Sequence, residues 1–186
     1  MQILAISGSL RANSSNTILL SAAAALAPEG VGISLFDGIG DLPHFNPDLD
    51  NEAVPHAVKL WRSKLTTADG VVFSVPEYAH GVPGVLKNAL DWIVGSGELV
   101  DKPVALFNAS PRSTFAQASL VETLTVMSAK VMSNASVTLQ LLGKPQSVDE
   151  ITADPGLSAA LRSAIALFVL AIDAGDPSRP ARAQDQ

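Results

Sequence analysis

The amino-acid sequence predicts an α/β domain built on a parallel β-sheet with helices on both faces. Short apolar runs, which favour buried strands, alternate along the chain with segments whose apolar residues recur at helical spacing. The predicted strands are residues 2–6, 31–36, 70–75 and 103–107, with a fifth inside 131–141. The predicted helices are residues 17–26, 54–67, 82–94, 116–130 and 157–172. Strands separated by helices in this way form a parallel sheet, and helices cover both of its apolar faces.

Local patterns justify the individual elements. The apolar positions of the first helix are Ile18, Leu19, Ala22, Ala25 and Leu26. Those of the second are Val58, Leu60, Trp61 and Leu65, and those of the last are Leu161, Ile165, Phe168 and Ile172. Pro76 ends the third strand. Pro83 lies in the first turn of the helix predicted at 82–94, where a missing N–H does little harm.

The length of the chain fits one domain. It has 186 residues, of which 47% are hydrophobic, so it can form a sizeable core. We find no internal repeat and no linker, and we predict a single domain over residues 1–174. Residues 175–186 are rich in Pro, Ala, Arg and Asp, and we expect them to form a disordered tail.

Composition and charge argue against several classes of protein. The formal net charge is −6, whereas a nucleic-acid-binding domain presents a basic face. There is no cysteine, which excludes disulfides, iron–sulfur clusters and thiol nucleophiles. Met1 is not followed by a signal-peptide pattern, and the apolar run 164–172 is far shorter than the ~20 residues of a membrane span. We therefore expect a cytoplasmic protein without nucleic-acid or membrane partners.

The loop at residues 8–16 has the chemistry of a phosphate site. It follows the first strand and begins a helix, whose N-terminus carries partial positive charge and unpaired N–H groups. Arg11 adds a full charge, and further donors come from Ser9, Ser14, Ser15, Asn16 and Thr17. The loop lacks the Gly-Lys-Ser/Thr ending of a P-loop and the later glycines of a dinucleotide fingerprint. The alternative is a helix cap rich in Ser and Asn, which is common.

Two further loops follow the third and fourth predicted strands. In α/β sheets, ligands bind beyond the carboxyl ends of the strands. Residues 76–84 contain two prolines and two glycines, which suit a shaped loop that contacts a flat ring through main-chain N–H groups. The alternative is a rigid connection that binds nothing. Residues 108–114 supply small and polar groups, and Arg112 among them can equally be a solvated surface charge.

Other kinds of site find little support. His44, His56 and His80 are not spaced for metal binding with another ligand. No Gly-x-Ser-x-Gly motif of a serine hydrolase is present. A response-regulator receiver needs an acidic cluster at the ends of the first and third strands, and this chain has Ser7-Gly8 and Ser74-Val75-Pro76 there.

The first two loops resemble those of the NADPH-dependent FMN reductase family, which includes bacterial quinone, chromate and azo-dye reductases. Gly8-Ser9-Leu10-Arg11 with Ser14 and Asn16 resembles its phosphate loop. Pro76-Glu77-Tyr78 and residues 83–92 are similar to its second signature. The resemblance runs from Met1 to about Ile172. It implies a flavodoxin-like three-layer sandwich with a five-stranded parallel sheet in the order 2-1-3-4-5.

The resemblance also implies which residues contact the cofactor. Those that would hold the FMN phosphate are Ser9, Arg11, Ser14, Ser15 and Asn16, with Thr17 beside them. Those that would line the isoalloxazine ring are Pro76, Glu77, Tyr78, His80 and Gly81. Ser110 would lie near the other side of the ring or the ribityl chain, with Arg112 as a helper. Many members have Asn and an aromatic residue in place of Ala79 and His80, and a glycine-rich third loop, so this chain departs from the family pattern around the substrate pocket.

The implied activity is that of an FMN-dependent oxidoreductase. It takes hydride from NADH or NADPH and passes electrons to a quinone, another small organic acceptor or free flavin. The flavin supplies the chemistry, so no side chain is named as catalytic. One alternative is an FMN-binding electron carrier without NAD(P)H activity, although such carriers are often far more acidic than −6. The other is a regulatory or scaffold protein that kept the fold and lost the flavin.

The helix predicted at 82–94 also suggests an oligomer. Val85, Ala89 and Trp92 form one apolar stripe, and Leu86, Leu90 and Ile93 form a second beside it. We predict that one stripe faces the sheet and that the other lies in the interface of a homodimer or homotetramer, with Trp92 as its anchor. Family members are commonly dimers or tetramers. The alternative is a helix that its own domain buries on both sides.

Overall fold

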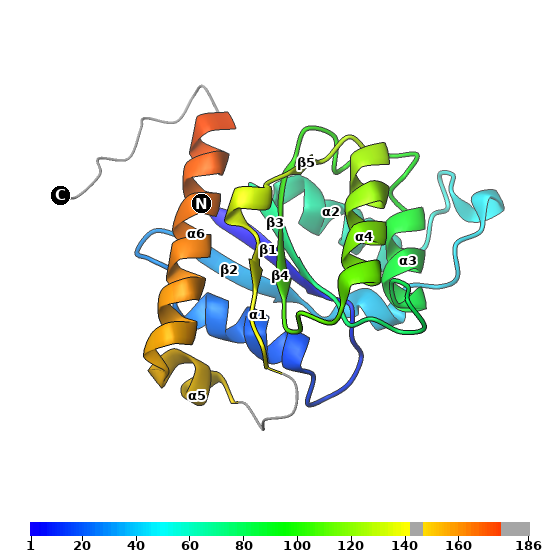
Figure 1. Ribbon diagram of the computed structural model, residues 1–186. Helices are drawn as coiled ribbons and strands as arrows, with labels where there is room; N and C mark the ends of the chain where they lie inside the picture. Colours follow the sequence, from blue (N-terminus) through cyan, green and yellow to red (C-terminus); the bar gives the residue numbers. More distant parts are fainter. Residues whose placement is uncertain (142–146, 176–186) are drawn as a thin grey trace.

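The computed structural model describes residues 1–141 and 147–175, which form one three-layer α/β sandwich (Figure 1). The strands are β1 (Gln2–Ser7), β2 (Gly32–Phe36), β3 (Gly70–Ser74), β4 (Pro103–Asn108), β5 (Lys130–Val131) and β6 (Val137–Thr138). All their pairings are parallel, in the order β2-β1-β3-β4-β5, with β6 also paired to β4. The predicted fold class and strand order are therefore confirmed.

The helices lie on both faces of the sheet, as predicted (Figure 1). They are α1 (Ser15–Ala25), α2 (His56–Thr67), α3 (Gly84–Asp91), α4 (Thr114–Val126), α5 (Val148–Ala153) and α6 (Pro155–Gly175). Three 3₁₀ turns, Gly38–Asp41, Pro47–Leu49 and Ser133–Ala135, lie in the connections. Helices α2, α3 and α4 cover one face, and α1, α5 and α6 cover the other. The tail predicted at 175–186 falls, from 176 onward, outside the described residues.

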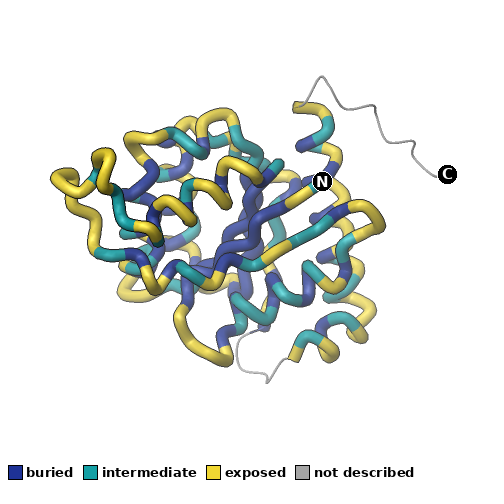
Figure 2. The backbone as a smooth tube through the Cα atoms, turned by 180° about the vertical axis from the view of Figure 1, so that it is seen from behind, coloured by how far each residue is buried: buried dark blue, intermediate teal, exposed yellow. Residues whose placement is uncertain are grey.

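Alternation along each strand gives the domain two cores. In β1, Leu4 and Ile6 point to the α2–α4 side, and Ile3 and Ala5 point to the α1–α6 side. In Figure 2 the central strands β1, β3 and β4 are accordingly almost entirely dark blue, while yellow is concentrated on the helices and loops outside them. Strands that are covered on both faces expose side chains to solvent only at their ends. We therefore look for a ligand site at the ends of the strands.

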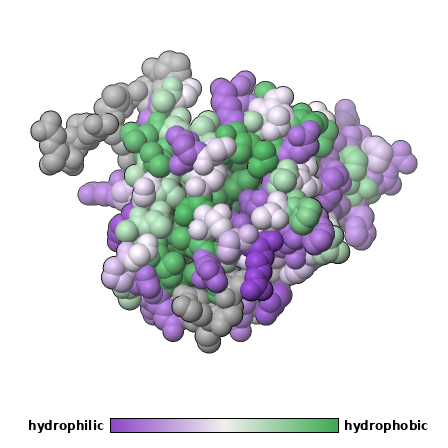
Figure 3. Space-filling view, in the orientation of Figure 1, coloured by the Kyte–Doolittle hydropathy of each residue, from purple (hydrophilic) through white to green (hydrophobic). Residues whose placement is uncertain are grey.

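The strand region beside β4 differs from the single fifth strand predicted within 131–141. It is broken into β5 and β6, two residues each, by the 3₁₀ turn Ser133–Ala135. The reason is a side chain: Ser136 Oγ accepts from the Leu106 N–H at 3.0 Å and donates to the Met132 carbonyl, also at 3.0 Å. This hydroxyl replaces main-chain pairing where the edge bends. Figure 3 shows apolar side chains gathered between α6 and α4, the region that contains this edge in Figure 1.

The C-terminal helices depart from the prediction in two ways. Helix α5 (Val148–Ala153) was not predicted, and it forms with a reciprocal Ser147–Glu150 capping box. Helix α6 extends beyond the predicted 157–172 and is long and apolar enough, by length and composition, to cross a membrane. However, one face of α6 is buried in the domain core through Leu161, Ala164, Ile165, Phe168, Val169 and Ile172. The buried face accounts for part of the apolar character of α6, and Leu167 and Leu170 are exposed.

The structure of α3 contradicts the prediction that one apolar stripe of this helix lies in an oligomer interface. The structured helix is shorter than the predicted 82–94, and Pro83 is its N-cap. Both stripes are buried inside the chain itself, apart from the half-buried Val85. Trp92 is 0% exposed, because residues 42–45 of the loop after β2 cover it. Trp92 is therefore not available to anchor an interface, and the second apolar stripe indicates a second intramolecular contact.

Candidate functional site

Buried polar side chains gather at the carboxyl edge of the sheet. Among the described residues, the buried polar ones are Ser7, Ser9, Ser14, Asn16, Ser74, Asn108, Ser110 and Ser113. All of them lie at the carboxyl ends of β1, β3 or β4, or in the loops and helix starts that follow. Burying polar groups costs free energy unless they are hydrogen-bonded, so their concentration at one edge marks this edge as the candidate site. It includes the point between β1 and β3 where the strand order reverses.

The loop after β1 is shaped by hydrogen bonds between near neighbours. The Ser9 N–H donates to Ser7 Oγ at 3.3 Å, and the Arg11 N–H donates to Ser9 Oγ at 3.3 Å. Side chains that accept from the main chain two residues later are typical of turns. Thr17 Oγ1 also donates to Ser7 Oγ, at 2.9 Å, which ties the first turn of α1 to the end of β1.

Helix α1 begins inside the site with an uncapped end. Ser14 is its N-cap and is 3% exposed, yet its side chain makes no cap hydrogen bond. The first N–H groups of a helix have no partner within that helix, and they carry its partial positive charge. Asn16 is fixed by a buried hydrogen bond from Ser74 Oγ to its Oδ1 at 3.0 Å. The start of α1 therefore offers unpaired N–H groups next to the end of β3, which suits an anion.

The loop after β4 repeats the geometry of the first loop. The Ser110 N–H donates to Asn108 Oδ1 at 3.0 Å, and the Arg112 N–H donates to Ser110 Oγ at 3.1 Å. Ser113 follows as the N-cap of α4 and, like Ser14, makes no side-chain cap bond. Two helix starts with uncommitted N-cap serines thus face the same edge of the sheet.

The loop after β3 forms a tight reverse turn. The Tyr78 N–H donates to the Gly81 carbonyl at 3.2 Å, and the Gly81 N–H donates back to the Tyr78 carbonyl at 3.0 Å. Between them, Ala79 and His80 have φ values of 50° and 57°, the left-handed region that residues with a Cβ rarely adopt. The turn presents Tyr78 with 53% of its surface exposed.

A pocket of about 180 Å³ lies between these three loops. Its lining is Ser9, Arg11, Ser14, Ser15, Asn16, Pro76, Glu77, Tyr78, Ala109, Ser110 and Ser113. Nine of these residues are among those expected from the sequence, drawn from all three loops. Ala109 and Ser113 were not expected, although Ser113 precedes a helix just as Ser14 does. The pocket combines hydroxyl and amide groups, one cation and one aromatic wall.

Four expected site residues lie outside the lining of this pocket. Thr17 is bonded to Ser7 and lines a neighbouring cavity between the first loop and the end of β2. His80 stacks on Phe115, with 4.2 Å between ring centroids and 15° between planes. Gly81 closes the turn with Tyr78. Arg112 is exposed, and only its main chain takes part in the loop geometry.

The later part of the second signature, residues 83–92, has a structural role: it holds the loop after β2. Asn88 Oδ1 accepts from the Phe45 N–H at 2.7 Å, and Asn88 Nδ2 donates to the Pro43 carbonyl at 3.0 Å. Trp92 Nε1 donates to the same Pro43 carbonyl at 2.8 Å. These bonds hold the loop after β2 against α3.

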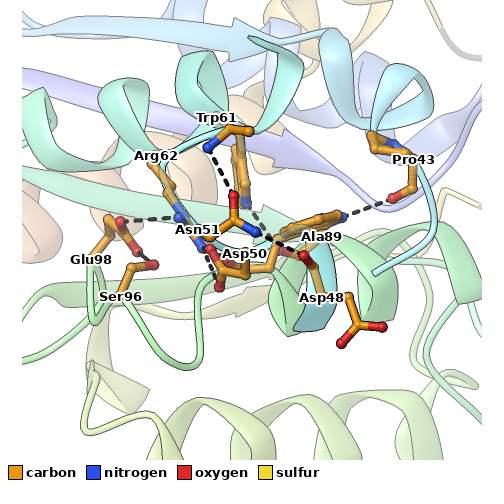
Figure 4. A network of polar contacts seen from close by, with 11 residues as sticks. Pro43, Asp48, Asp50, Asn51, Trp61, Arg62, Ala89, Ser96 and Glu98 are labelled. Atoms are coloured by element: carbon orange, nitrogen blue, oxygen red, sulfur yellow. Dashed lines mark hydrogen bonds and ion pairs between the residues drawn. The ribbon is translucent and has the colours of Figure 1, made fainter. Parts of the chain in front are cut away.

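A polar network holds the next part of that loop (Figure 4). The Arg62 guanidinium of α2 pairs with Asp50 at 2.9 Å and with Glu98 at 3.8 Å, and donates to the Trp92 carbonyl. Trp61 Nε1 of the same helix donates to the Ala89 carbonyl at 2.9 Å. Residues 83–92 therefore help to bind the long loop after β2 to the domain, and none of them lines the pocket, whereas Pro76, Glu77 and Tyr78 of the same signature do.

Charge in the pocket comes from two residues. They are Arg11, which makes no ion pair with any residue that the structure describes, and Glu77. Within residues 1–141 and 147–175, no group of three His, Asp or Glu side chains could hold a metal ion.

Away from the site, burial lowers the pKa of the Lys102 amino group, although nearby Asp69 and Glu98 partly offset the effect. Lys102 Nζ donates to the carbonyls of Leu65 and Ala68, both at 2.7 Å, at the C-terminal end of α2.

The fold and the site together define a flavodoxin-like α/β domain with a polar pocket at its strand-order reversal. The family model described as NADPH-dependent FMN reductase matches residues 1–141. The chain belongs to this family.

Individual relatives agree with the family. An NAD(P)H-dependent FMN reductase of Pseudomonas aeruginosa is 40% identical over 112 residues, which are 59% of this chain and 60% of that protein. A quinone reductase of Pseudomonas putida is 41% identical over 109 residues, 56% of this chain and 57% of that one. The matched part is thus less than two thirds of these curated relatives.

A solved structure covers more of the chain. The flavoenzyme NAD(P)H:(acceptor) oxidoreductase FerB from Paracoccus denitrificans superposes with a TM-score of 0.83 at 30% identity, covering 94% of this chain and 98% of that one. An NADH:FMN oxidoreductase structure has a TM-score of 0.69 at 24% identity, which supports the fold alone.

Proposed function

We propose that this chain is an FMN-dependent oxidoreductase that takes hydride from NADH or NADPH and passes electrons to a quinone, another small organic acceptor or free flavin. The observation that carries the proposal is the pocket itself: the loops after β1, β3 and β4 meet at an uncapped helix start beside Arg11, and the first and third of these loops bring buried serines to it. Family membership and the names of the relatives support it.

The residues present fit an FMN molecule. The start of α1, with Ser9, Ser14 and Arg11, would hold the phosphate, because unpaired N–H groups and a guanidinium stabilise a dianion. Ser110 and Ser113 would donate to the ribityl chain or the ring edge. The pocket is smaller than the ~300–1,000 Å³ of a typical cofactor site, so part of the FMN would lie outside it, next to the exposed Tyr78.

The protein would contribute binding and orientation to the reaction. Bound FMN supplies hydride and electron transfer, which no side chain of this chain can perform. The main-chain N–H groups of the loops after β3 and β4 would hold the ring in a fixed orientation. Pro76 and the Tyr78–Gly81 turn fix the shape of the wall facing it. We name no catalytic side chain.

A purified, full-length sample tests this proposal. We expect a yellow protein with about one FMN per chain, and oxidation of NADH or NADPH that depends on an added quinone. Both nucleotides are compared over a panel of quinones, nitroaromatics and free FMN. A flavin-loaded protein that oxidises neither nucleotide would instead be an electron carrier. A colourless protein that binds no FMN would contradict the proposal. The cytoplasmic location and the homo-oligomeric state stay predictions.

A further inference from the structure

Glu77 caps a helix that begins in another loop. Glu77 follows β3 and lines the pocket, and its Oε2 accepts from the Ala116 N–H at 3.0 Å. Ala116 is the third residue of α4, and its N–H is one of those that an N-cap side chain normally binds. A carboxylate at this end of a helix also interacts favourably with the helix dipole. Glu77 therefore caps α4 in place of Ser113, although it precedes Ala116 by 39 residues in the chain.

We call the capping of α4 by Glu77 in place of Ser113 the exchange of caps. It leaves the Ser113 hydroxyl without a partner among the described residues. Ser113 is the N-cap of α4, but it makes no side-chain cap bond. It is 7% exposed, and it lines the pocket. Because Ser113 lines the pocket, its hydroxyl is open to the pocket and available to hydrogen-bond a ligand there.

A second contact holds the same two segments together. His80 stacks on Phe115, the residue before Ala116 in α4. Glu77 and His80 lie on either side of Tyr78, in the loop that the Tyr78–Gly81 turn closes. The loop after β3 and the start of α4, which form two walls of the pocket, are therefore joined at two points. The exposed Tyr78 lies between Glu77 and His80 in the sequence.

We propose that Glu77 is a positioning residue: by capping α4 in place of Ser113, it joins the two walls of the pocket and keeps the Ser113 hydroxyl available to the ligand. The identity of that ligand as FMN rests on the function proposed above. The exchange of caps does not, because it concerns the protein without ligand.

A double-mutant cycle on flavin-free, full-length protein tests the exchange of caps. In the wild-type background, Ser113→Ala removes no cap, and we expect the melting temperature to change by less than about 1 °C. In the Glu77→Ala background, the Ser113 hydroxyl can turn to the free N–H groups of α4. There Ser113→Ala should lower the melting temperature by about 2–4 °C, the usual effect of losing one N-cap in a domain of this size. Equal shifts in the two backgrounds would overturn the proposal.

FMN affinity tests the consequence for the pocket. In the wild-type background, Ser113→Ala should weaken FMN binding about fivefold, as the loss of one neutral hydrogen bond does. Glu77→Ala should weaken it by at least as much, and Ser113→Ala should then add less than about twofold. Unchanged FMN affinity in Ser113→Ala, with a wild type that binds FMN, would overturn the proposal.

Two further variants separate geometry from charge. Glu77→Gln keeps the acceptor for the Ala116 N–H and should bind FMN within about twofold of wild type. Glu122→Gln removes the same charge from the exposed surface of α4 and should change neither readout. A Glu77→Gln variant as weak as Glu77→Ala would overturn the capping role. If the wild type binds no FMN, the proposed function fails, and the melting-temperature cycle still decides the exchange of caps.

Discussion

Replacing Arg11 with alanine tests where a phosphate would bind. Arg11 is the only charged residue between Gly8 and Asn16, and it lines the pocket beside the uncapped start of α1. It has no ion-pair partner in the described part of the chain, so its guanidinium is available to a ligand. A phosphate monoester carries between one and two negative charges near neutral pH.

The size of the effect follows from the exposure of Arg11. A hydrogen bond to a charged group contributes about 1.5–3 kcal/mol, whereas a fully solvated ion pair contributes about 0–1 kcal/mol. Arg11 is exposed but sits at a pocket with buried polar walls. We therefore expect Arg11→Ala to cost about 1.4 kcal/mol, which is about tenfold in the Kd for FMN. Riboflavin has no phosphate, and its Kd should change by less than about twofold.

Titration of flavin fluorescence with flavin-free protein measures both constants. The loss for FMN should shrink as the salt concentration rises, because salt screens exposed charges. Arg112→Ala is the matched control: Arg112 is an exposed arginine of the loop after β4 that does not line the pocket, and its removal should change FMN affinity little. Equal losses for FMN and riboflavin in Arg11→Ala would refute the assignment of the phosphate to α1.

Four further predictions follow from the structure. Tyr78→Ala should weaken FMN binding and shift the absorbance spectrum of the bound flavin without lowering the melting temperature of the flavin-free protein, since Tyr78 is 53% exposed; an unchanged spectrum with full affinity would retire its role. Asn88→Ala loses two good hydrogen bonds to the loop after β2 and should cost about 2 kcal/mol, or about 4–8 °C in a thermal melt; a shift below about 1 °C would contradict that role. Burial lowers the pKa of Lys102 below 10.5, so the unfolded chain binds its proton more tightly; the unfolding free energy of wild type relative to Lys102→Met should therefore rise, not fall, as the pH approaches 10.5 in denaturant titrations. Light scattering at micromolar concentration should show a homo-oligomer, and a monomer of 19.3 kDa with bound FMN and full turnover would end that prediction.

The sequence determined the elements whose causes are local. Strands and helices follow from apolar periodicity, which each segment carries within itself. The loops after β1 and β4 were also readable, because Ser7, Ser9, Asn108 and Ser110 each accept from an N–H only two residues later. Most of the pocket lining was therefore expected. A local signal for α5 is present too, because Ser147 and Glu150 have the spacing of a capping box.

Only the tertiary structure decided the contacts between distant residues. Two apolar stripes on the helix predicted at 82–94 indicated two buried sides, but the sequence did not distinguish a partner subunit from the loop after β2, which Asn88 and Trp92 bind from 43 and 49 residues away. In the same way, Glu77 in the family motif indicated a pocket residue, and only the fold brought it to the start of α4. Side-chain patterns specify how much surface is buried and which groups need partners, whereas the chain's path in space determines which distant segment supplies them.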